Sequence, residues 1–293
     1  MLTHWVDFFD ELQNVRGRSP NTVMAYRRDL ELYEEFLKSR KKIELFYEFL
    51  GKKNLGVRSQ ARVISSVRTY LKFCERHGEK APHLRQLRLP KVRVSLPKPT
   101  TFAEFEKLYR ACDGSDAYTT ARNRIALLLL FGVGCRVSEL IALDVSDFNV
   151  TEGWLKVLGK GNKERLVPLT KFLQDELESY LRKARAKLLR KPKTRSIIVN
   201  DRGHRPSRVD IWRWFRMWSN AAGLSKTISP HKLRHGCATS LLEGGADLRS
   251  IQMLLGHASI QTTRIYTNVS VKKVRDEIDK YHPLSGLRID SDT

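Results

Sequence analysis

The chain has 293 residues and carries 54 lysines and arginines against 32 aspartates and glutamates, which gives a formal net charge of +22. This length exceeds what one compact core usually organises, so we expect two domains. Such an excess of cations is more than solubility requires and indicates a polyanionic partner, with nucleic acid favoured over an acidic membrane surface.

The N-terminal part of the chain is predicted to be a bundle of four helices. Residues 1–13 have acidic residues and apolar residues at helical spacing, which is typical of an amphipathic helix and not of a signal peptide. A Ser-Pro pair at residues 19 and 20 starts a long helix, and residues 57–78 form another that ends at Gly78. With residues 43–50 these segments make a small domain, which we place at residues 1–88.

An extended linker follows this domain. Residues 82–99 contain four prolines and several cations and show no sustained periodicity. We place the linker at residues 89–99 and a second domain at residues 100–293.

The second domain is predicted to be mixed, with helices around a small antiparallel sheet. Residues 145–169 alternate apolar and polar positions in short runs broken by Gly and Asn, which indicates the sheet. Residues 196–200 resemble one more short strand. Helices are expected at residues 101–112, 121–132, 170–191, 212–223, 229–245 and 248–256. The fold class is therefore mainly α with a small antiparallel β-sheet.

Membrane insertion and secretion are not indicated. The longest apolar run, residues 125–133, is too short to cross a bilayer and is typical of a buried core helix. The four cysteines lie far apart without a C-x-x-C pair, which fits a reducing compartment better than a disulfide framework or a thiolate zinc site. We therefore expect a cytoplasmic protein without a membrane segment.

The stretch SPHKLRHG, residues 229–236, begins a helix with His231 and Arg234 on one face of its first turns. Backbone N–H groups and the helix dipole favour an anion such as phosphate there. Zinc binding by His231 and His235 is an alternative, but the glutamate of a metalloprotease motif is missing. Taken alone, the stretch is explained more simply by ordinary capping and packing residues.

Two further segments carry cations that suit phosphate chemistry. In GCRVSEL, Arg136 opens a helix and Glu139, three residues later, can hold its guanidinium, although a structural ion pair would look the same. In GKGNKERLVPL, Lys160 lies at the tip of a predicted hairpin, where it is either solvated or able to contact phosphate or donate a proton. The spacing of a nucleotide-binding phosphate loop is absent from this hairpin.

The stretch LLGHASIQTTRIYTNVS, residues 254–270, contains His257 and Tyr266. Alone, Tyr266 is best interpreted as a packing residue. Together with the other segments it suggests a reaction that uses them all, the attack of a tyrosine hydroxyl on a DNA phosphodiester. Two arginines suit the charged oxygens of the phosphate, and a lysine can protonate the departing oxygen. This chemistry needs no metal or nucleotide, so we expect no cofactor.

These motifs, in this order, resemble the tyrosine recombinases of the phage integrase superfamily, and among them the Xer recombinases. The resemblance covers nearly the whole chain and implies an N-terminal core-binding domain and a C-terminal catalytic domain. It also implies a role for each motif residue. Tyr266 would be the nucleophile that forms a 3′-phosphotyrosyl bond, Arg136, Arg234 and His257 would hold the phosphate, Lys160 would be the general acid, His231 would assist proton transfer, and Glu139 would support the site.

The resemblance further implies a tetramer of identical or related recombinases on double-stranded DNA with a specific site, acting through a Holliday junction. The Xer likeness favours resolution of chromosome or plasmid dimers, with a DNA translocase as a candidate activator. Alternatives are an integrase of a phage or mobile element, a type IB topoisomerase, and a DNA-binding regulator without catalysis.

Four positions depart from the family pattern: Cys135, Gly236, Cys237 and Ser240 stand where other residues are usual. Gly236 is expected to weaken its helix by about 1 kcal/mol relative to alanine. We expect these departures to alter local packing and not the catalytic set.

Overall fold

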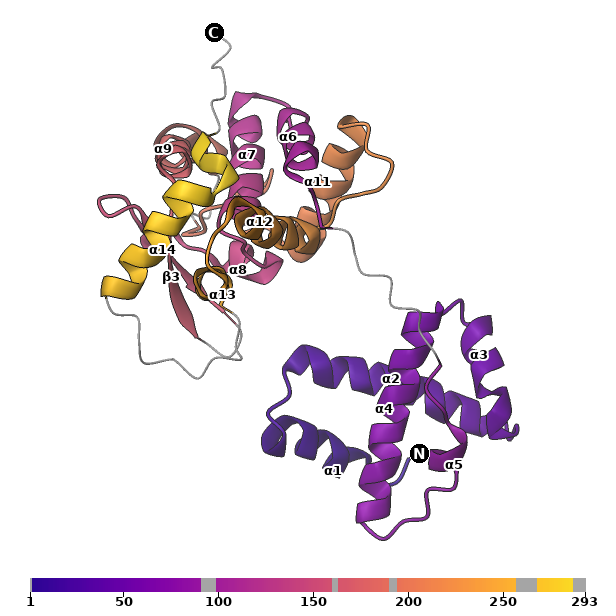
Figure 1. Ribbon diagram of the computed structural model, residues 1–293. Helices are drawn as coiled ribbons and strands as arrows, with labels where there is room; N and C mark the ends of the chain where they lie inside the picture. The colour runs from indigo at the N-terminus through magenta and orange to yellow at the C-terminus, as the bar shows by residue number, and fades with distance from the viewer. Residues whose placement is uncertain (1, 91–98, 160–162, 190–193, 257–267, 287–293) are drawn as a thin grey trace. The chain divides into compact units, whose positions relative to one another are not determined.

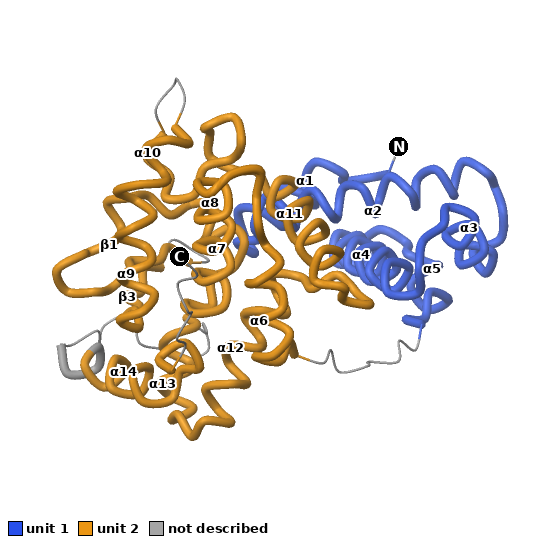
Figure 2. Tube along the Cα trace, turned by 90° about the horizontal axis from the view of Figure 1, so that it is seen from above, with its two compact units in different colours: residues 1–96 blue, residues 97–293 orange. Residues whose placement is uncertain are grey.

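The computed structural model describes residues 2–90, 99–159, 163–189, 194–256 and 268–286. The chain forms two compact units, residues 1–96 (unit 1) and residues 97–293 (unit 2), which are coloured separately in Figure 2. Each unit has its own hydrophobic core.

All the secondary-structure elements among the described residues of unit 1 are helices, as expected. Ser19 accepts a hydrogen bond from the backbone N–H of Thr22, and Pro20 occupies the first turn, so the long second helix starts where the sequence predicts. The elements are α1 (Trp5–Asp10), the π-helical η1 (Glu11–Val15), α2 (Pro20–Lys38), the 3₁₀ turn η2 (Ile43–Leu45), α3 (Phe46–Lys52), α4 (Val57–Arg76) and the short α5 (His83–Gln86).

The two long helices of unit 1, α2 and α4, contact each other (Figure 1), and a buried carboxylate joins them. Asp29 of α2 is 1 % exposed and accepts hydrogen bonds from Ser66 and Arg62 of α4. Burial raises the pKa of Asp29 even though both partners act to lower it. The Arg62 side chain remains half exposed, so this pair is solvated on one side.

Unit 2 combines many helices with one small sheet, which confirms the predicted fold class. Its elements are α6 (Phe102–Arg110), α7 (Ala117–Gly132), α8 (Val137–Ala142), η3 (Val145–Asp147), β1 (Phe148–Asn149), β2 (Trp154–Leu158), β3 (Glu164–Pro168), α9 (Lys171–Ser179), the π-helical η4 (Tyr180–Ala184), α10 (Arg185–Leu188), α11 (Arg208–Ala221), α12 (Pro230–Gly244), α13 (Leu248–Leu255), α14 (Asn268–Tyr281) and η5 (Pro283–Gly286).

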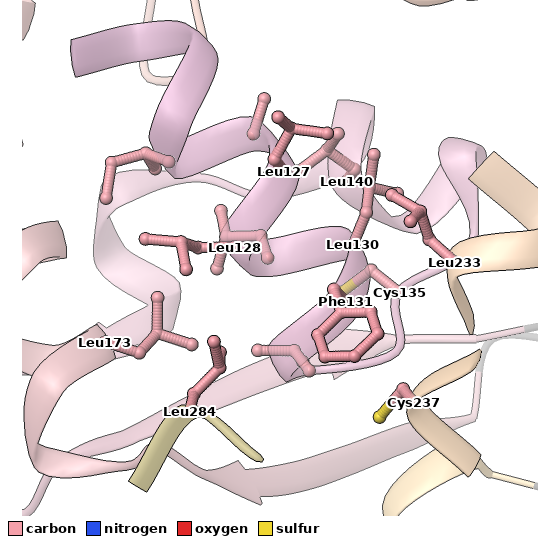
Figure 3. Packing of buried hydrophobic residues seen from close by; sticks show 14 of the residues in the cluster. Leu127, Leu128, Leu130, Phe131, Cys135, Leu140, Leu173, Leu233, Cys237 and Leu284 are labelled. Atoms are coloured by element: carbon pink, nitrogen blue, oxygen red, sulfur yellow. The ribbon is translucent and has the colours of Figure 1, made fainter. Parts of the chain in front are cut away.

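Helix α7 is the centre of unit 2. Its second half is apolar on all sides, which is typical of a helix surrounded by other elements. Figure 3 shows side chains of α7 between Leu173 of α9, Leu233 of α12 and Leu284 of η5. A Cβ on Gly132 would lie 2.7 Å from Leu284 Cδ1, so glycine allows η5 to pack directly on the end of α7. No helix among the described residues is long and apolar enough to cross a bilayer.

The sheet of unit 2 is antiparallel with the order β1-β2-β3, as residues 145–169 predict. The longer hairpin pairs Leu155 with Val167 and Val157 with Arg165. Arg165 therefore shares the inward face of β3 with Val167, because side chains two positions apart lie on the same face of a strand. This register places a guanidinium inside the domain.

The prediction of a strand at residues 196–200 is wrong. Ser196 forms only an isolated bridge with Asp144, and the backbone N–H of Ile197 donates to the carbonyl of Leu143. The side chains of residues 197–199 are fully buried. The apolar run thus reflects burial on all sides and not strand pairing, an ambiguity that short apolar runs always carry.

The unusual residues around α12 are accommodated by close packing. A Cβ on Gly236 would lie 2.3 Å from the carbonyl oxygen of Thr100, so only glycine allows this approach of two backbones. Cys135 and Cys237 are fully buried in the core (Figure 3). Burial raises the pKa of both thiols to about 12, so they are protonated packing residues at neutral pH.

Candidate active site

Arg136 stands at the start of α8, after a turn in which Gly134 has φ +61°. Its backbone N–H donates to Glu139 Oε2 (2.9 Å) and its Nη1 donates to Glu139 Oε1 (2.6 Å). The carboxylate therefore fixes both the backbone and the head of this arginine. The Arg136 side chain is still 40 % exposed, and within the described ranges its Nε and Nη2 groups have no hydrogen-bond partner. Part of the guanidinium is free to bind a ligand.

Glu139 is the common partner of three arginines. It is 3 % exposed, accepts a hydrogen bond from Arg165 Nη2 at 2.8 Å, and lies 3.7 Å from Arg234 Nη1. Burial alone would raise the pKa of this carboxyl, but the hydrogen bond and charge of Arg165 and the two hydrogen bonds from Arg136 lower it to about 2. Glu139 is therefore ionised at every physiological pH.

Arg234 lies on α12 and is only 6 % exposed. Its Nη1 donates to the carbonyl of Gly134 (2.5 Å), and its Nη2 donates to the carbonyl of Leu255 at the end of α13. Burial and the nearby charge of Arg136 lower the pKa of Arg234 to about 10, although Glu139 acts in the opposite direction. The guanidinium remains charged at neutral pH in spite of its burial.

Arg165 of β3 is the third arginine, and the sequence motifs assign no role to it. It is 3 % exposed, and its Nε donates to the carbonyl of Leu254 at 2.9 Å while its Nη2 binds Glu139. The sequence does contain a signal for this residue, because Arg165 lies two positions before the buried Val167 and therefore on the same face of the strand. A charged residue on the inward face of a strand needs a partner, and here the partner is Glu139.

The cluster of Arg136, Glu139, Arg165 and Arg234, called the arginine cluster below, holds three cations and one anion, a net charge of 3 − 1 = +2. Within the described parts of the chain, Glu139 is the one carboxylate in ion-pair contact with these arginines. Buried charge without compensation is costly, so the excess favours a bound anion. Guanidinium groups bind phosphate oxygens with paired hydrogen bonds.

The remaining expected site residues fall in two groups. His231 is described: it is exposed in the first turn of α12, which Ser229 caps by accepting from the N–H of Lys232. Lys160, His257 and Tyr266 lie outside the described residues.

The described residues just before Lys160 and just before His257 lie beside the arginine cluster. A Cβ on Gly159, which precedes Lys160, would lie 3.7 Å from Glu139 Oε1. A Cβ on Gly256, which precedes His257, would lie 3.0 Å from Arg165 Cδ. The hairpin that carries Lys160 and the chain that leads to His257 thus both leave the described structure beside the cluster.

Comparison with known proteins identifies the family. Residues 98–273 match the phage integrase family, and residues 6–78 match the phage integrase N-terminal SAM-like domain. Tyrosine recombinase XerD of Halalkalibacterium halodurans is 36 % identical over 281 residues, which cover 92 % of this chain and 93 % of the relative. Tyrosine recombinase XerD of Listeria innocua is 38 % identical over 292 residues, which cover 94 % of this chain and 97 % of the relative.

A solved structure shares the fold. The XerH site-specific recombinase, in a post-cleavage complex with its palindromic difH substrate, matches with a TM-score of 0.65 and 24 % identity over 90 % of this chain and 81 % of that chain. The sequence relatives extend the likeness from the fold to the kind of enzyme. The chain therefore belongs to the phage integrase family and is a site-specific DNA recombinase of the tyrosine recombinase type.

Proposed function

We propose that this recombinase cuts and rejoins DNA by transferring a phosphodiester to Tyr266. The observation that carries the proposal is the arginine cluster, whose net charge of +2 is largely buried and in which the Arg136 side chain is 40 % exposed and accessible to an anion. A DNA phosphate supplies that anion. Its non-bridging oxygens would accept hydrogen bonds from Arg136 and Arg234, which stabilise the charge of the transition state.

The proposed step exchanges one bond to phosphorus for another. The oxygen of Tyr266 forms a bond to phosphorus, the bond from phosphorus to the 5′ oxygen breaks, and a 3′-phosphotyrosyl linkage and a free 5′ hydroxyl result. Lys160 gives its proton to the departing oxygen, and His231 assists removal of the tyrosine proton. His257 adds a hydrogen bond to the phosphate. Attack of a 5′ hydroxyl from another strand reverses the step, so the linkage keeps the energy needed for rejoining.

The biological role that fits best is that of the XerD-named relatives. We place the protein in resolution of chromosome or plasmid dimers, through a Holliday junction, as a tetramer with itself or with a related recombinase. A DNA translocase is a candidate activator. The unit 1 helices would grip the DNA together with unit 2, and both units carry an excess of lysine and arginine suited to that contact.

A covalent-capture experiment tests the tyrosine assignment. The binding site is first selected from random DNA, and a nicked duplex with that site is then incubated with the protein in EDTA and run on a denaturing gel. A covalent protein–DNA band is expected, and Tyr266→Phe should abolish it, while Tyr118→Phe, at an exposed position on α7, should not. A band that persists in Tyr266→Phe contradicts the assignment.

Other outcomes of the same experiment separate the remaining functions. No covalent band with any selected site would indicate a regulator that only binds DNA. Relaxation of supercoiled DNA that lacks the site would indicate a type IB topoisomerase. Selection of a site that matches an element end, with integration of that element, would indicate an integrase.

A sulfur substitution tests the general acid. Lys160→Ala should slow cleavage of normal DNA but cleave at nearly the wild-type rate when sulfur replaces the departing 5′ oxygen, because a thiolate leaves without a proton. Equal slowing on both substrates would refute this role for Lys160.

A further inference from the structure

Arg165 connects three segments of unit 2 that lie far apart in the sequence. It belongs to β3, the hairpin strand that follows Lys160 in the sequence, and it binds Glu139 of α8 and the carbonyl of Leu254 in α13. The side chain is 3 % exposed, so both contacts are shielded from water. Each of the three segments leads to a residue of the proposed reaction: Lys160, Arg136 and His257.

Stability alone does not account for an arginine at this position. Arg165 adds a third cation to a cluster that already holds Arg136 and Arg234, and its charge is one of the causes that lower the pKa of Arg234. Replacing a buried ion pair by apolar residues of similar volume is often neutral or stabilising. The guanidinium therefore has a function that offsets its electrostatic cost.

The geometry of the contacts indicates what that function is. Arg165 uses two different nitrogens, Nε for the carbonyl of Leu254 and Nη2 for Glu139 Oε2, and the rigid plane of the guanidinium fixes the angle between them. Glu139 Oε2 also accepts from the backbone N–H of Arg136. Through this shared carboxylate oxygen, Arg165 thus fixes the start of α8, where Arg136 has N–H groups without a partner among the described residues.

We infer that Arg165 is a positioning residue that holds Arg136, through Glu139, against the scissile phosphate and fixes the end of α13 relative to it. This inference rests on the proposed function. Lysine at this position would keep the charge beside Glu139 but would lose the second hydrogen bond, since a single ammonium group does not reproduce the fork. Displacement of a catalytic group by about 1 Å lowers a rate by about a hundredfold.

The experiment compares cleavage of a charged phosphate with cleavage of two neutral analogues. Single-turnover cleavage is measured for the wild type, Arg165→Lys and Arg165→Met with a normal scissile phosphate and with each diastereomer of a methylphosphonate, in which a neutral methyl group replaces one charged oxygen. We expect Arg165→Lys to cleave the normal phosphate about 30- to 100-fold more slowly than the wild type. For at least one methylphosphonate, the ratio of the wild-type rate to the Arg165→Lys rate should fall below about fivefold, because the negative charge that Arg136 stabilises is missing.

A buried arginine outside the site provides the matched control. Arg122 of α7 is 2 % exposed and binds the carbonyl of Val199 and the side chain of Asp201. Arg122→Met should lower stability, but any change in its cleavage rate should be the same on the phosphate and on both methylphosphonates. If Arg165→Met does not fold, Arg165→Lys decides the question alone.

Two results overturn the inference. Either Arg165→Lys cleaves the normal phosphate as fast as the wild type, or its defect is the same on the phosphate and on both methylphosphonates, which is what a purely structural residue gives. Failure of the proposed function is a different result: the wild type then forms no covalent product, or the product survives Tyr266→Phe.

Discussion

Replacement of Glu139 by glutamine tests the electrostatics of the arginine cluster most directly. Glutamine keeps the size of the side chain but removes the charge, and its amide group points an N–H donor at arginines that can only donate. Glu139 accepts from Arg136 and Arg165 and lies 3.7 Å from Arg234 Nη1. The variant leaves three cations close together without a carboxylate, so we expect a large loss of stability.

The structure sets the size of this loss. The pKa of Glu139 falls from 4.5 to about 2, which corresponds to about 3 kcal/mol in favour of the ionised form at neutral pH, since one pKa unit is about 1.4 kcal/mol. Removing one partner of a buried ion pair costs about 3–5 kcal/mol. We therefore expect Glu139→Gln to lower the free energy of unfolding of unit 2 by about 3–5 kcal/mol at pH 7, a large share of the roughly 5–15 kcal/mol typical of a domain.

The pH dependence of the loss has a defined sign. The folded-state pKa of Glu139 lies below its unfolded value of 4.5, so its stabilisation is fully present above pH 4.5 and is lost as the pH falls from 4.5 toward 2. The difference in unfolding free energy between wild type and variant should be constant from neutral pH down to about pH 5.5 and shrink below pH 4.5.

Urea denaturation followed by tryptophan fluorescence measures this difference, because four of the five tryptophans lie in unit 2. Asp29→Asn, followed by circular dichroism, is the matched control in unit 1. Burial raises the pKa of Asp29, and its partner Arg62 is half exposed, so its loss should cost about 1 kcal/mol or less. A loss below about 1 kcal/mol for Glu139→Gln, or a loss independent of pH, would refute the reasoning.

Three more predictions concern other parts of the structure. Gly236→Ala should gain about 1 kcal/mol of helix propensity but lose about 1–3 kcal/mol to overpacking, because its Cβ would lie 2.3 Å from the carbonyl oxygen of Thr100. Gly51→Ala in α3, where a Cβ meets only Gln60 Nε2 at 4.0 Å, should raise the melting temperature instead, and a gain at both positions would contradict the packing argument. Inorganic phosphate should raise the melting temperature of the wild type more than chloride does at equal ionic strength. Arg136→Gln should reduce this effect, because Arg136 has the accessible guanidinium. An unchanged shift in the variant would show that the anion binds elsewhere. Burial lowers the pKa of His282 to about 4 from 6.5, so the folded state binds this proton less well and stability should fall as the pH drops from 6.5 to 4. His282→Gln should flatten this slope in urea denaturation, and an identical slope would show that other groups cause it.

The local parts of the site could be predicted from the sequence. Arg136 and Glu139 are three residues apart at the start of a helix, so the geometry of one turn brings them together, and the structure contains this pair. The start of α12 follows from the same kind of signal, Ser229 before Pro230. Short-range patterns of this kind are set by backbone geometry and need no knowledge of the rest of the fold.

Contacts between distant segments could not be predicted in the same way. Arg165 and Leu254 are 89 residues apart, and Arg234 and Gly134 are 100 residues apart. From the sequence alone, Gly236 is expected to weaken its helix. The reason for glycine is the close approach of the Thr100 backbone, which lies far away in the sequence. The apolar run at 197–199 predicts part of a strand, although burial on all sides produces the same pattern. The roles of Lys160, His257 and Tyr266 stay predictions.

The arginine cluster also binds the end of α13, in addition to the anion proposed above. The last carbonyls of a helix have no partner within the helix and carry its partial negative charge. Here the carbonyl of Leu254 accepts from Arg165 and that of Leu255 accepts from Arg234. The same cations that suit a phosphate therefore also hold the helix end that leads to His257. Loss of either arginine would remove positive charge and release this helix end at once, so a slower reaction in such a variant has two causes. The methylphosphonate comparison separates them, because only the first cause depends on the charge of the phosphate.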